Sequence, residues 1–280
     1  MELRSAREIK KMRAAGLIVW QAHQAAARII QPGITTSEIN DVFRETFVTC
    51  GAEPLFLNYG GIPGTRPPFP AETCISINEQ VVHGIPGKRK LETGDLVSLD
   101  TGCRIGGWCG DAAVTHAVGK INATQRKLLQ VTRDVLSLAI ELMNVRTRWS
   151  EVSREMQSYV EAAGFSVVED MVGHAIGRNL HEPPQVPNYF SESWRAREDF
   201  DLRPGVVLAV EPMVNVGVKS LITRKDGWTV VTKDAKPSAH FEHTIAITSE
   251  GVVRLTGPPN DDELASMPIW LQDRSSWVLW

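Results

Sequence analysis

Apolar residues recur every three to four positions at the start of the chain and alternate with polar residues farther on. After Ser5, the spacing of Ile9, Met12 and Val19 is that of one face of a helix. Pro32 cannot continue such a helix, because proline lacks the backbone N–H and clashes with the preceding turn. The pattern therefore predicts a long amphipathic helix that ends before Pro32.

A second helical repeat follows, for which Thr36 or Ser37 is the expected N-cap. Its apolar positions include Phe43 and Phe47, which we expect to face the core. Residues 58–70 (NYGGIPGTRPPFP) contain too much proline and glycine for a regular element. They are predicted to form a surface loop.

Alternation and β-branched residues dominate from Thr73 to Gly119, which predicts antiparallel strands. Helical spacing returns at 123–144 and 150–163. Further strands are predicted around 165–174, 205–211, 227–233 and 240–248. The order of helices, strands, helices and strands indicates an α+β domain built from two similar halves.

Composition and charge narrow the choice of protein class. The chain has 280 residues and a formal net charge of −3, so no basic excess suggests nucleic-acid binding. No apolar run of about 18 residues is present, so no membrane span is predicted. The N-terminus lacks the apolar core of a signal peptide, and we expect a cytoplasmic protein whose four cysteines are reduced.

Two aspartates lie on a predicted hairpin in the segment LVSLDTGCRIGGWCGDAAVTHAVG. Gly106-Gly107 is a favoured two-residue turn, because both positions tolerate positive φ. A turn at this place pairs Gly102 with Asp111 and makes Asp100 and Asp111 diagonal neighbours, roughly 7–8 Å apart along one face. Gly102 has no side chain to fill the space between the two carboxylates.

Two like charges on apolar strands repel one another and lose hydration, and a cation between them removes both penalties. For this hairpin alone, an equally good interpretation has one aspartate facing solvent or hydrogen-bonded to the backbone. The hairpin therefore suggests a metal site without establishing one.

Three further candidate ligands lie in the second half of the chain. His174 and His181 flank a glycine-rich segment, and the prolines that follow exclude a helix, so a strand end and a loop should display them. Glu211 ends an apolar strand and Glu242 begins another, where a carboxylate costs several kcal/mol unless it is paired or metal-bound. A lone histidine is more often structural than a ligand, and either glutamate alone could pair with an arginine.

Taken together, these residues form a plausible ligand set for divalent metal ions. Four carboxylates and one imidazole favour Mn, Fe(II) or Co, with Zn as an alternative. The number of ligands suits two ions roughly 3.5–4 Å apart, which is the arrangement of metal-assisted amide or ester hydrolysis. The expected ligands are Asp100, Asp111, His174, Glu211 and Glu242.

The motifs CISINEQVVHGIPG, SLDTGCRIGGWCGDAAVTHAVG, GHAIGRNLHEPPQVPNY, EPMVNVG, KDGWTVVTKD and SAHFEHTIAIT follow one another along the chain. In order and spacing they resemble type I methionine aminopeptidases, from about residue 3 to about residue 256. The resemblance implies a pita-bread fold, in which two pseudo-symmetric halves enclose a dinuclear metal site. It also implies one catalytic domain at 1–256, followed by a tryptophan-rich tail at 257–280.

The same resemblance implies a role for each ligand. Asp100 would chelate one metal ion, and His174 and Glu211 would hold the other. Asp111 and Glu242 would bridge the two ions. Glu211 would also be the acid/base for the attacking water, which the two ions share.

Substrate-binding positions are likewise implied. His83 and His181 match the histidines that contact the substrate and stabilise the tetrahedral intermediate, a role that suits a side chain with a tunable proton. Asn78 and Ser238 match residues whose backbone carbonyl groups bind a structural monovalent cation. The expected methionine pocket consists of Tyr59, Phe69, Cys74, Leu180 and Trp228. For each single pocket residue, plain core packing is the competing interpretation.

The chain departs from the family pattern at several places near the expected site. The loop before CISIN is longer than usual, Phe56 replaces a smaller residue, and Leu180 replaces an aromatic one. Gly102 stands where a hydroxyl residue usually supports the metal-binding aspartate. His240 stands where glutamine is common. None of these changes removes a ligand, but they leave the stringency of the pocket open.

The implied activity is removal of the initiator methionine from nascent proteins whose second residue is small, by a monomer that acts on peptide N-termini. A transient ribosome contact is a further expectation, and the tail could pack back onto the domain or bind a partner. One alternative is a prolidase or proline-directed aminopeptidase, which shares the five ligands but usually carries an additional N-terminal domain. A second alternative is a binding protein that has kept the fold and lost catalysis.

Overall fold

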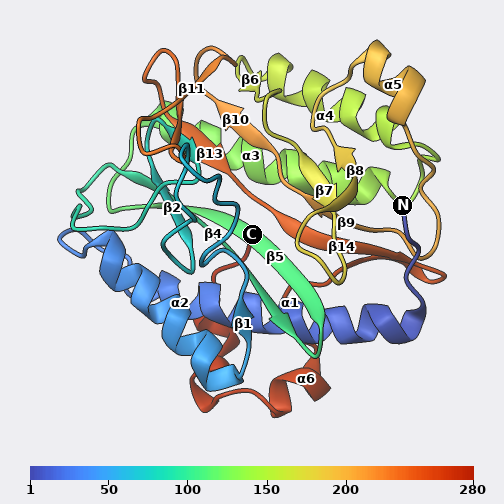
Figure 1. Ribbon diagram of the computed structural model, residues 1–280, viewed down its shortest axis with the longest axis horizontal. Coiled ribbons are helices and arrows are strands. Elements are labelled where there is room, and N and C mark those ends of the chain that lie inside the picture. The colour runs from blue at the N-terminus through green and yellow to red at the C-terminus, as the bar shows by residue number, and fades with distance from the viewer.

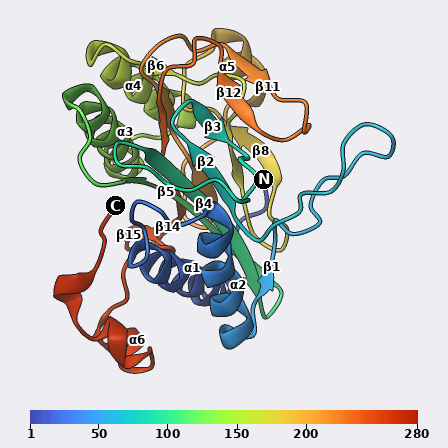
Figure 2. The same cartoon turned by 90° about the vertical axis from the view of Figure 1, so that its left-hand side faces the viewer.

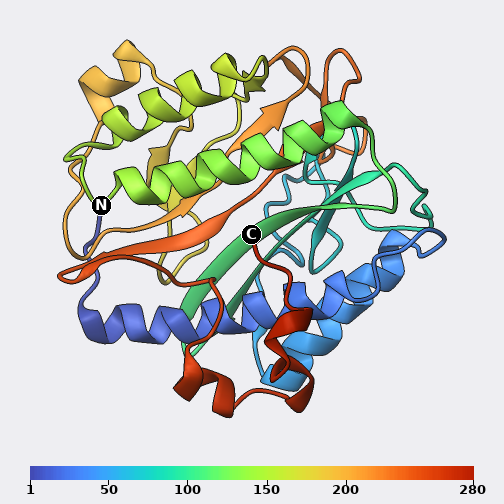
Figure 3. The same ribbon diagram turned by 180° about the vertical axis from the view of Figure 1, so that it is seen from behind.

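Four long helices cover one face of a curved layer of strands in the computed structural model, which describes residues 1–280 (Figure 1). Figure 3 shows these helices in front of the strands, so the opposite face of the layer stays free of long helices. They are α1 (Ala6–Ala27), α2 (Thr36–Cys50), α3 (Ala123–Leu142) and α4 (Trp149–Ala162). None of the helices has the length and apolar content that crossing a membrane requires.

The first half of the chain forms a four-stranded antiparallel sheet around the hairpin of β4 and β5, packed against α1 and α2. A short strand from this half joins two later strands in a separate sheet. The strands of this half are β1 (Glu53–Pro54), β2 (Cys74–Ile77), β3 (Gln80–Val82), β4 (Leu96–Ile105) and β5 (Trp108–Ala117).

The second half packs its own strands against α3 and α4. Its largest sheet has the order β15-β14-β9-β7-β8, and β13-β10-β6 forms a smaller one. The strands are β6 (Ser166–Val167), β7 (Gly173–Ala175), β8 (Glu182–Val186), β9 (Val207–Val210), β10 (Met213–Asn215), β11 (Leu221–Thr223), β12 (Val230–Thr232), β13 (Ser238–His240), β14 (His243–Thr248) and β15 (Gly251–Arg254). The short helices are α5 (Glu192–Glu198) and α6 (Asp261–Ala265).

The predicted register of the hairpin is confirmed. Gly106 and Gly107 form the turn with φ of 56° and 78°, and Gly102 is the cross-strand partner of Asp111. The positive φ values explain why two glycines stand here, since other residues rarely adopt that conformation. The turn thus sets which residues of β4 and β5 share a face.

One local prediction was wrong. The N-cap of α2 is Thr35, not Thr36 or Ser37, because Thr35 and Glu38 form a reciprocal capping box. His181 lies in the irregular segment before β8, as predicted. The strand β8 itself was not predicted, and it tolerates Pro183 and Pro184 because it lies at the edge of its sheet.

The C-terminal segment packs back onto the domain, as one of the two interpretations of the tail predicts. Trp277 meets Trp20 of α1 edge-on at 5.0 Å between ring centroids, and the Gln24 side chain donates to the carbonyl of Val278. The Trp280 ring stacks on His243 at the start of β14. Figure 2 shows this segment, in red, beside α1.

Residues 58–70 form the predicted loop, which projects from the body of the molecule (Figure 2). A backbone bridge between Ile62 and Arg66 closes its outer part. At its base, Asn58 donates its N–H to the carbonyl of Phe69. The projecting part is therefore a small closed turn on a narrow stem.

Candidate active site

One cavity of about 200 Å³ collects the residues that the sequence singled out. Residues from both halves of the chain line it, and they include acidic as well as apolar side chains. Its lining includes all five expected metal ligands: Asp100, Asp111, His174, Glu211 and Glu242.

The first two ligands come from the β4–β5 hairpin. Asp100 pairs with Ala113 across the strands, so it lies diagonally from Asp111 on the same face. A Cβ at Gly102 would lie 3.1 Å from Oδ1 of Asp111, closer than ordinary van der Waals contact. Because glycine has no side chain, Gly102 leaves enough space for the Asp111 carboxylate.

The other three ligands come from strands and strand ends of the second half. His174 lies in β7, Glu211 follows the last residue of β9, and Glu242 precedes the first residue of β14. Ligand atoms of Asp111, His174 and Glu242 all lie within 4.8 Å of one another. His174 Nε2 is also 3.6 Å from Oε1 of Glu211, so this histidine links both glutamates to the hairpin.

The carboxylates are buried without enough protein partners. One oxygen each of Asp100, Asp111 and Glu242 has no hydrogen-bond partner and almost no contact with solvent. An unpaired buried carboxylate is costly, and several kcal/mol per group is the usual scale. A divalent cation would satisfy these oxygens together, so the residues present fit a metal site.

The raised pKa values of the four carboxylic acids reflect the same unfavourable burial of negative charge. Burial raises the pKa of Asp111 to about 7, against the hydrogen bond that the Ala112 backbone gives it. Burial, and then the charge of Asp111, raise the pKa of Asp100 well above its ordinary value. Burial and the neighbouring aspartates do the same for Glu211, and burial with Asp111 and Glu211 does so for Glu242. Positive charge is thus what this cluster lacks.

Two histidines beside the cluster stay neutral. Burial lowers the pKa of His174 to about 3, and its Nδ1 lies 3.1 Å from the carbonyl of Ala175. With Nδ1–H donating there, the lone pair of Nε2 faces the carboxylates, which is how a metal-binding histidine is usually oriented. Burial also lowers the pKa of His240 to about 3, and its Nε2 lies 3.8 Å from Oε2 of Glu211.

The expected substrate histidines lie at the outer side of the cluster. The His181 ring is 4.2 Å from the His174 ring, and its Nδ1 is 2.6 Å from the hydroxyl of Tyr59. His83 has a φ of 58° and meets the Trp228 ring edge-on at 6.0 Å. Burial lowers the pKa of His83 to about 4.

The apolar wall contains every residue of the expected methionine pocket. Phe69 and Trp228 meet edge-on at 5.2 Å, and Cys74 is the cross-strand partner of Asp100. These side chains line the cavity and also belong to one buried apolar cluster. They therefore contribute both to the pocket and to the core. The lining members of this cluster are Phe56, Phe69, Cys74, Leu180 and Trp228.

One lining residue was missed. Arg66 reaches the cavity from the projecting loop and places its guanidinium 4.1 Å from the centre of the Trp228 ring. No periodicity or motif marks an arginine in a proline-rich loop, and only the fold of the loop shows where it goes. Its position introduces a positive charge at the rim of an acidic cavity.

The two residues expected to donate to a monovalent cation lie together. The Ser238 N–H donates to the Asn78 carbonyl at 2.9 Å, and Asn78 has a φ of 56°. The cation itself stays a prediction.

Comparison with known proteins assigns most of the chain to one family. The model of metallopeptidase family M24 matches residues 10–249. Methionine aminopeptidase 1 of Bacillus subtilis is 44% identical over 250 residues, covering 89% of this chain and 96% of the relative. Methionine aminopeptidase of Clostridium perfringens is 44% identical over 254 residues, covering 91% and 98%.

Solved structures agree. The structure of methionine aminopeptidase from Thermotoga maritima matches with a TM-score of 0.84 and 41% identity, covering 91% of this chain and 99% of that one. Prolidase from Pyrococcus furiosus matches with a TM-score of 0.70 and 21% identity, covering 92% and 66%, which speaks for the fold alone. The expected pita-bread fold is confirmed.

Proposed function

The chain belongs to metallopeptidase family M24, and on this premise we propose that it is a methionine aminopeptidase that uses divalent metal ions. It removes the N-terminal methionine of proteins and peptides. The observation that carries the proposal is the cluster of five ligands with orphaned carboxylate oxygens, placed beside an apolar cavity wall. A thioether side chain suits a wall of aromatic rings and sulfur.

We propose two metal ions, held by the ligands in the arrangement that the family resemblance implies. Asp100 would hold one ion, His174 and Glu211 the other, and Asp111 and Glu242 would bridge them. Carboxylates and one imidazole suit Mn, Fe(II), Co or Zn, and the identity of the ions is an open part of the proposal. When bound, such ions lower the pKa of water and polarise a scissile carbonyl.

The protein's own residues position the substrate and move the protons. Glu211 accepts a proton from the attacking water and returns it to the departing amine, a role for which a buried carboxylate with a raised pKa is suited. When the Tyr59 hydroxyl donates to Nδ1 of His181, the proton of the neutral imidazole lies on Nε2. That N–H can stabilise negative charge on the carbonyl oxygen of the substrate, and His83 completes the polar side of the pocket.

A proline-directed aminopeptidase is the closest alternative, since prolidases share the fold. The test compares kcat/KM on Met-Ala-Ser with that on X-Pro peptides, using protein loaded with Mn²⁺ or Co²⁺. We expect Met-Ala-Ser to be preferred. Preference for X-Pro would contradict the proposal, and no turnover of any methionine peptide would favour a binding protein without catalysis.

The cellular setting is also a proposal. We propose that the enzyme acts in the cytoplasm on nascent proteins with a small second residue, as a monomer with a transient ribosome contact. Residues 1–256 would be the catalytic domain and residues 257–280 its tail, and a structural monovalent cation would bind at Asn78 and Ser238. Metal analysis, sedimentation with ribosomes and a peptide panel varying the second residue test these points.

A further inference from the structure

Arg66 is the only arginine or lysine that lines the cavity. It comes from the projecting loop and is partly exposed, whereas Asp111 and Glu242 are buried, so it lies toward the open end. The methionine of a substrate enters and the rest of a long chain stays outside, so the substrate must run past this open end. A cation placed there is in position to act on the residues that follow the cleaved bond.

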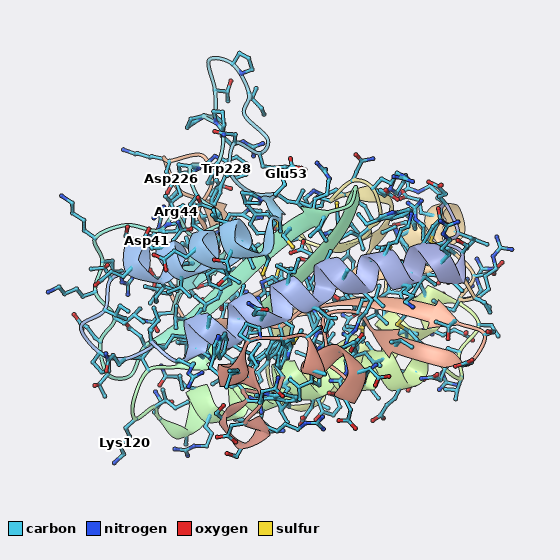
Figure 4. The ribbon with its side chains drawn as sticks, turned by 90° about the horizontal axis from the view of Figure 1, so that it is seen from below. Asp41, Arg44, Glu53, Lys120, Asp226 and Trp228 are labelled. Atoms are coloured by element: carbon cyan, nitrogen blue, oxygen red, sulfur yellow. The ribbon has the colours of Figure 1, made fainter.

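The arginine is held in a built cradle. Nε and Nη2 donate to the Gly60 carbonyl at 3.1 and 2.7 Å, and the guanidinium stacks on Trp228. A Cβ at Gly227, where φ is 77°, would lie 3.0 Å from Cγ of Arg66, so a larger residue there would crowd the arginine. The Trp228 indole N–H in turn donates to the Pro67 carbonyl at 2.8 Å. Figure 4 shows Trp228 near the base of the projecting loop.

The charge of this arginine is left free for a ligand. Its protein acceptor is a carbonyl, and Nη1 makes no hydrogen bond. Asp226, on the adjoining turn, uses its carboxylate oxygens on Trp228 and Thr229 instead. A guanidinium has five N–H donors, so several remain for a bidentate partner such as a carboxylate. The positive charge also lowers the pKa of His83, behind burial and the charge of His181.

The position of the Arg66 guanidinium indicates which residue of the substrate it can contact. In an extended peptide, alternate side chains point to the same side, and residues one and three are roughly 7 Å apart. Trp228 belongs to the wall expected to receive the methionine side chain, and the guanidinium of Arg66 lies over the same ring. The third residue of the substrate therefore points toward the guanidinium.

We propose that Arg66 is a specificity-determining residue that favours substrates with an acidic third residue. The inference rests on the proposed function, because it assumes that methionine occupies the cavity. An exposed or half-exposed ion pair changes kcat/KM by about three- to fivefold. Salt weakens such a pair, so the preference should shrink between low and high ionic strength.

The experiment uses full-length, metal-loaded protein and three peptide amides: Met-Ala-Asp-Ser, Met-Ala-Asn-Ser and Met-Ala-Lys-Ser. The amide removes the C-terminal carboxylate, and a parallel set with a free C-terminus measures the contribution of that group. The wild type should cleave the aspartate peptide about three- to fivefold better than the asparagine peptide, and the lysine peptide worst. Arg66→Gln should bring the ratios close to one, and Arg66→Lys should keep part of the preference.

Lys225→Gln is the matched control, because Lys225 is an exposed cation on the turn before Trp228 that does not line the cavity. It should keep the wild-type ratios. Equal ratios in wild type and Arg66→Gln, or a uniform loss on all three peptides, would overturn the inference while leaving the proposed function standing. Loss of the preference in Lys225→Gln would also overturn it, since a general field would then be the cause. Absence of turnover by the wild type would refute both proposals together.

Discussion

The inner and outer ends of the cavity are built in different ways. At the inner end, Asp111 and Glu242 are 3% and 2% exposed and stand on or beside strands whose register the sheets fix. At the outer end, Tyr59 is 40% exposed and comes from an irregular loop. The inner end places like charges close together at buried or half-buried positions. The outer end presents one hydroxyl and one cation, those of Tyr59 and Arg66, at exposed or partly exposed positions.

Different contacts hold the two ends in place. The β4–β5 pairing runs without interruption from Leu96–Ala117 to Ile105–Trp108, so neither aspartate can shift alone. The loop depends on a few side-chain contacts, chiefly those of Trp228 with Pro67 and Arg66. The sheets therefore fix the positions of the expected metal ligands, whereas Arg66 is held in a loop by a few side-chain contacts.

The largest expected effect comes from removing one inner carboxylate. Glu242→Gln or Asp100→Asn keeps the side-chain size but removes the charge and one oxygen ligand, so kcat should fall by about 10³-fold or more. Thermal unfolding should remain cooperative, because the substitutions relieve repulsion among buried carboxylates. Metal content by mass spectrometry and kcat on Met-Ala-Ser check both points. Asp262→Asn, at an exposed position in α6, is the control, and near-normal rates in either site variant would refute the assignment.

The second effect concerns metal removal and pH. Burial raises the pKa of Asp111 to about 7 in the metal-free fold, above its value in an unfolded chain. A group with a raised pKa stabilises the folded state in acid, and this stability is lost as pH rises through the folded pKa. Buried histidines with lowered pKa values, among them His174 and His240, act in the opposite sense, because the unfolded chain protonates them near pH 6. The carboxylate effect is therefore measured as a difference: the melting temperature of chelator-treated wild type, relative to that of Asp111→Asn, should be lower at pH 8 than at pH 6.

Added Mn²⁺ should raise that melting temperature more at pH 8 than at pH 6, because metal and protons compete for the same carboxylates. Differential scanning fluorimetry measures both series. A wild-type melting temperature that rises from pH 6 to pH 8 relative to that of Asp111→Asn would contradict the view that the inner end lacks positive charge.

The difference between the two ends also explains what the sequence could reveal. The Gly106-Gly107 turn and the period of two fixed the register of the hairpin, so the relation of Asp100 to Asp111 followed from local rules. His174, Glu211 and Glu242 come from separate elements, and only the folded sheets bring them beside the hairpin. Their joint role was suggested by residue type and then by family resemblance, not by geometry.

The arrangement of the outer end could for the most part not be predicted from local sequence patterns. Residues 58–70 were correctly predicted as a loop, but the path of a loop depends on tertiary contacts such as that of Pro67 with Trp228. The position of Arg66 could not be inferred for that reason. The strand β8 was not predicted for a similar reason: prolines are compatible with a strand only at the edge of a sheet, and only the folded sheet shows that β8 lies there.

A moderate effect is expected from Tyr59→Phe, which removes the hydroxyl 2.6 Å from Nδ1 of His181. Without that partner the imidazole can rotate or change tautomer, so kcat should fall about tenfold while KM changes less than about twofold. Steady-state kinetics on Met-Ala-Ser separates the two constants. Tyr159→Phe, whose hydroxyl bonds Asp134 at the surface, is the matched control. A rise in KM with unchanged kcat would mean that Tyr59 is only a wall of the pocket.

The smallest effect should come from the tip of the loop. Ile62 is 49% exposed, and its link to Arg66 runs through backbone atoms that Ile62→Ser does not alter. The substitution should change kcat/KM on Met-Ala-Asn-Ser by less than about twofold and the melting temperature by about 1 °C or less, as is usual for surface positions. A loss of more than about fivefold in kcat/KM would show that the tip contacts the substrate. The outer end of the site would then extend beyond Arg66, and the selective segment would be the whole projecting loop instead of its anchored part.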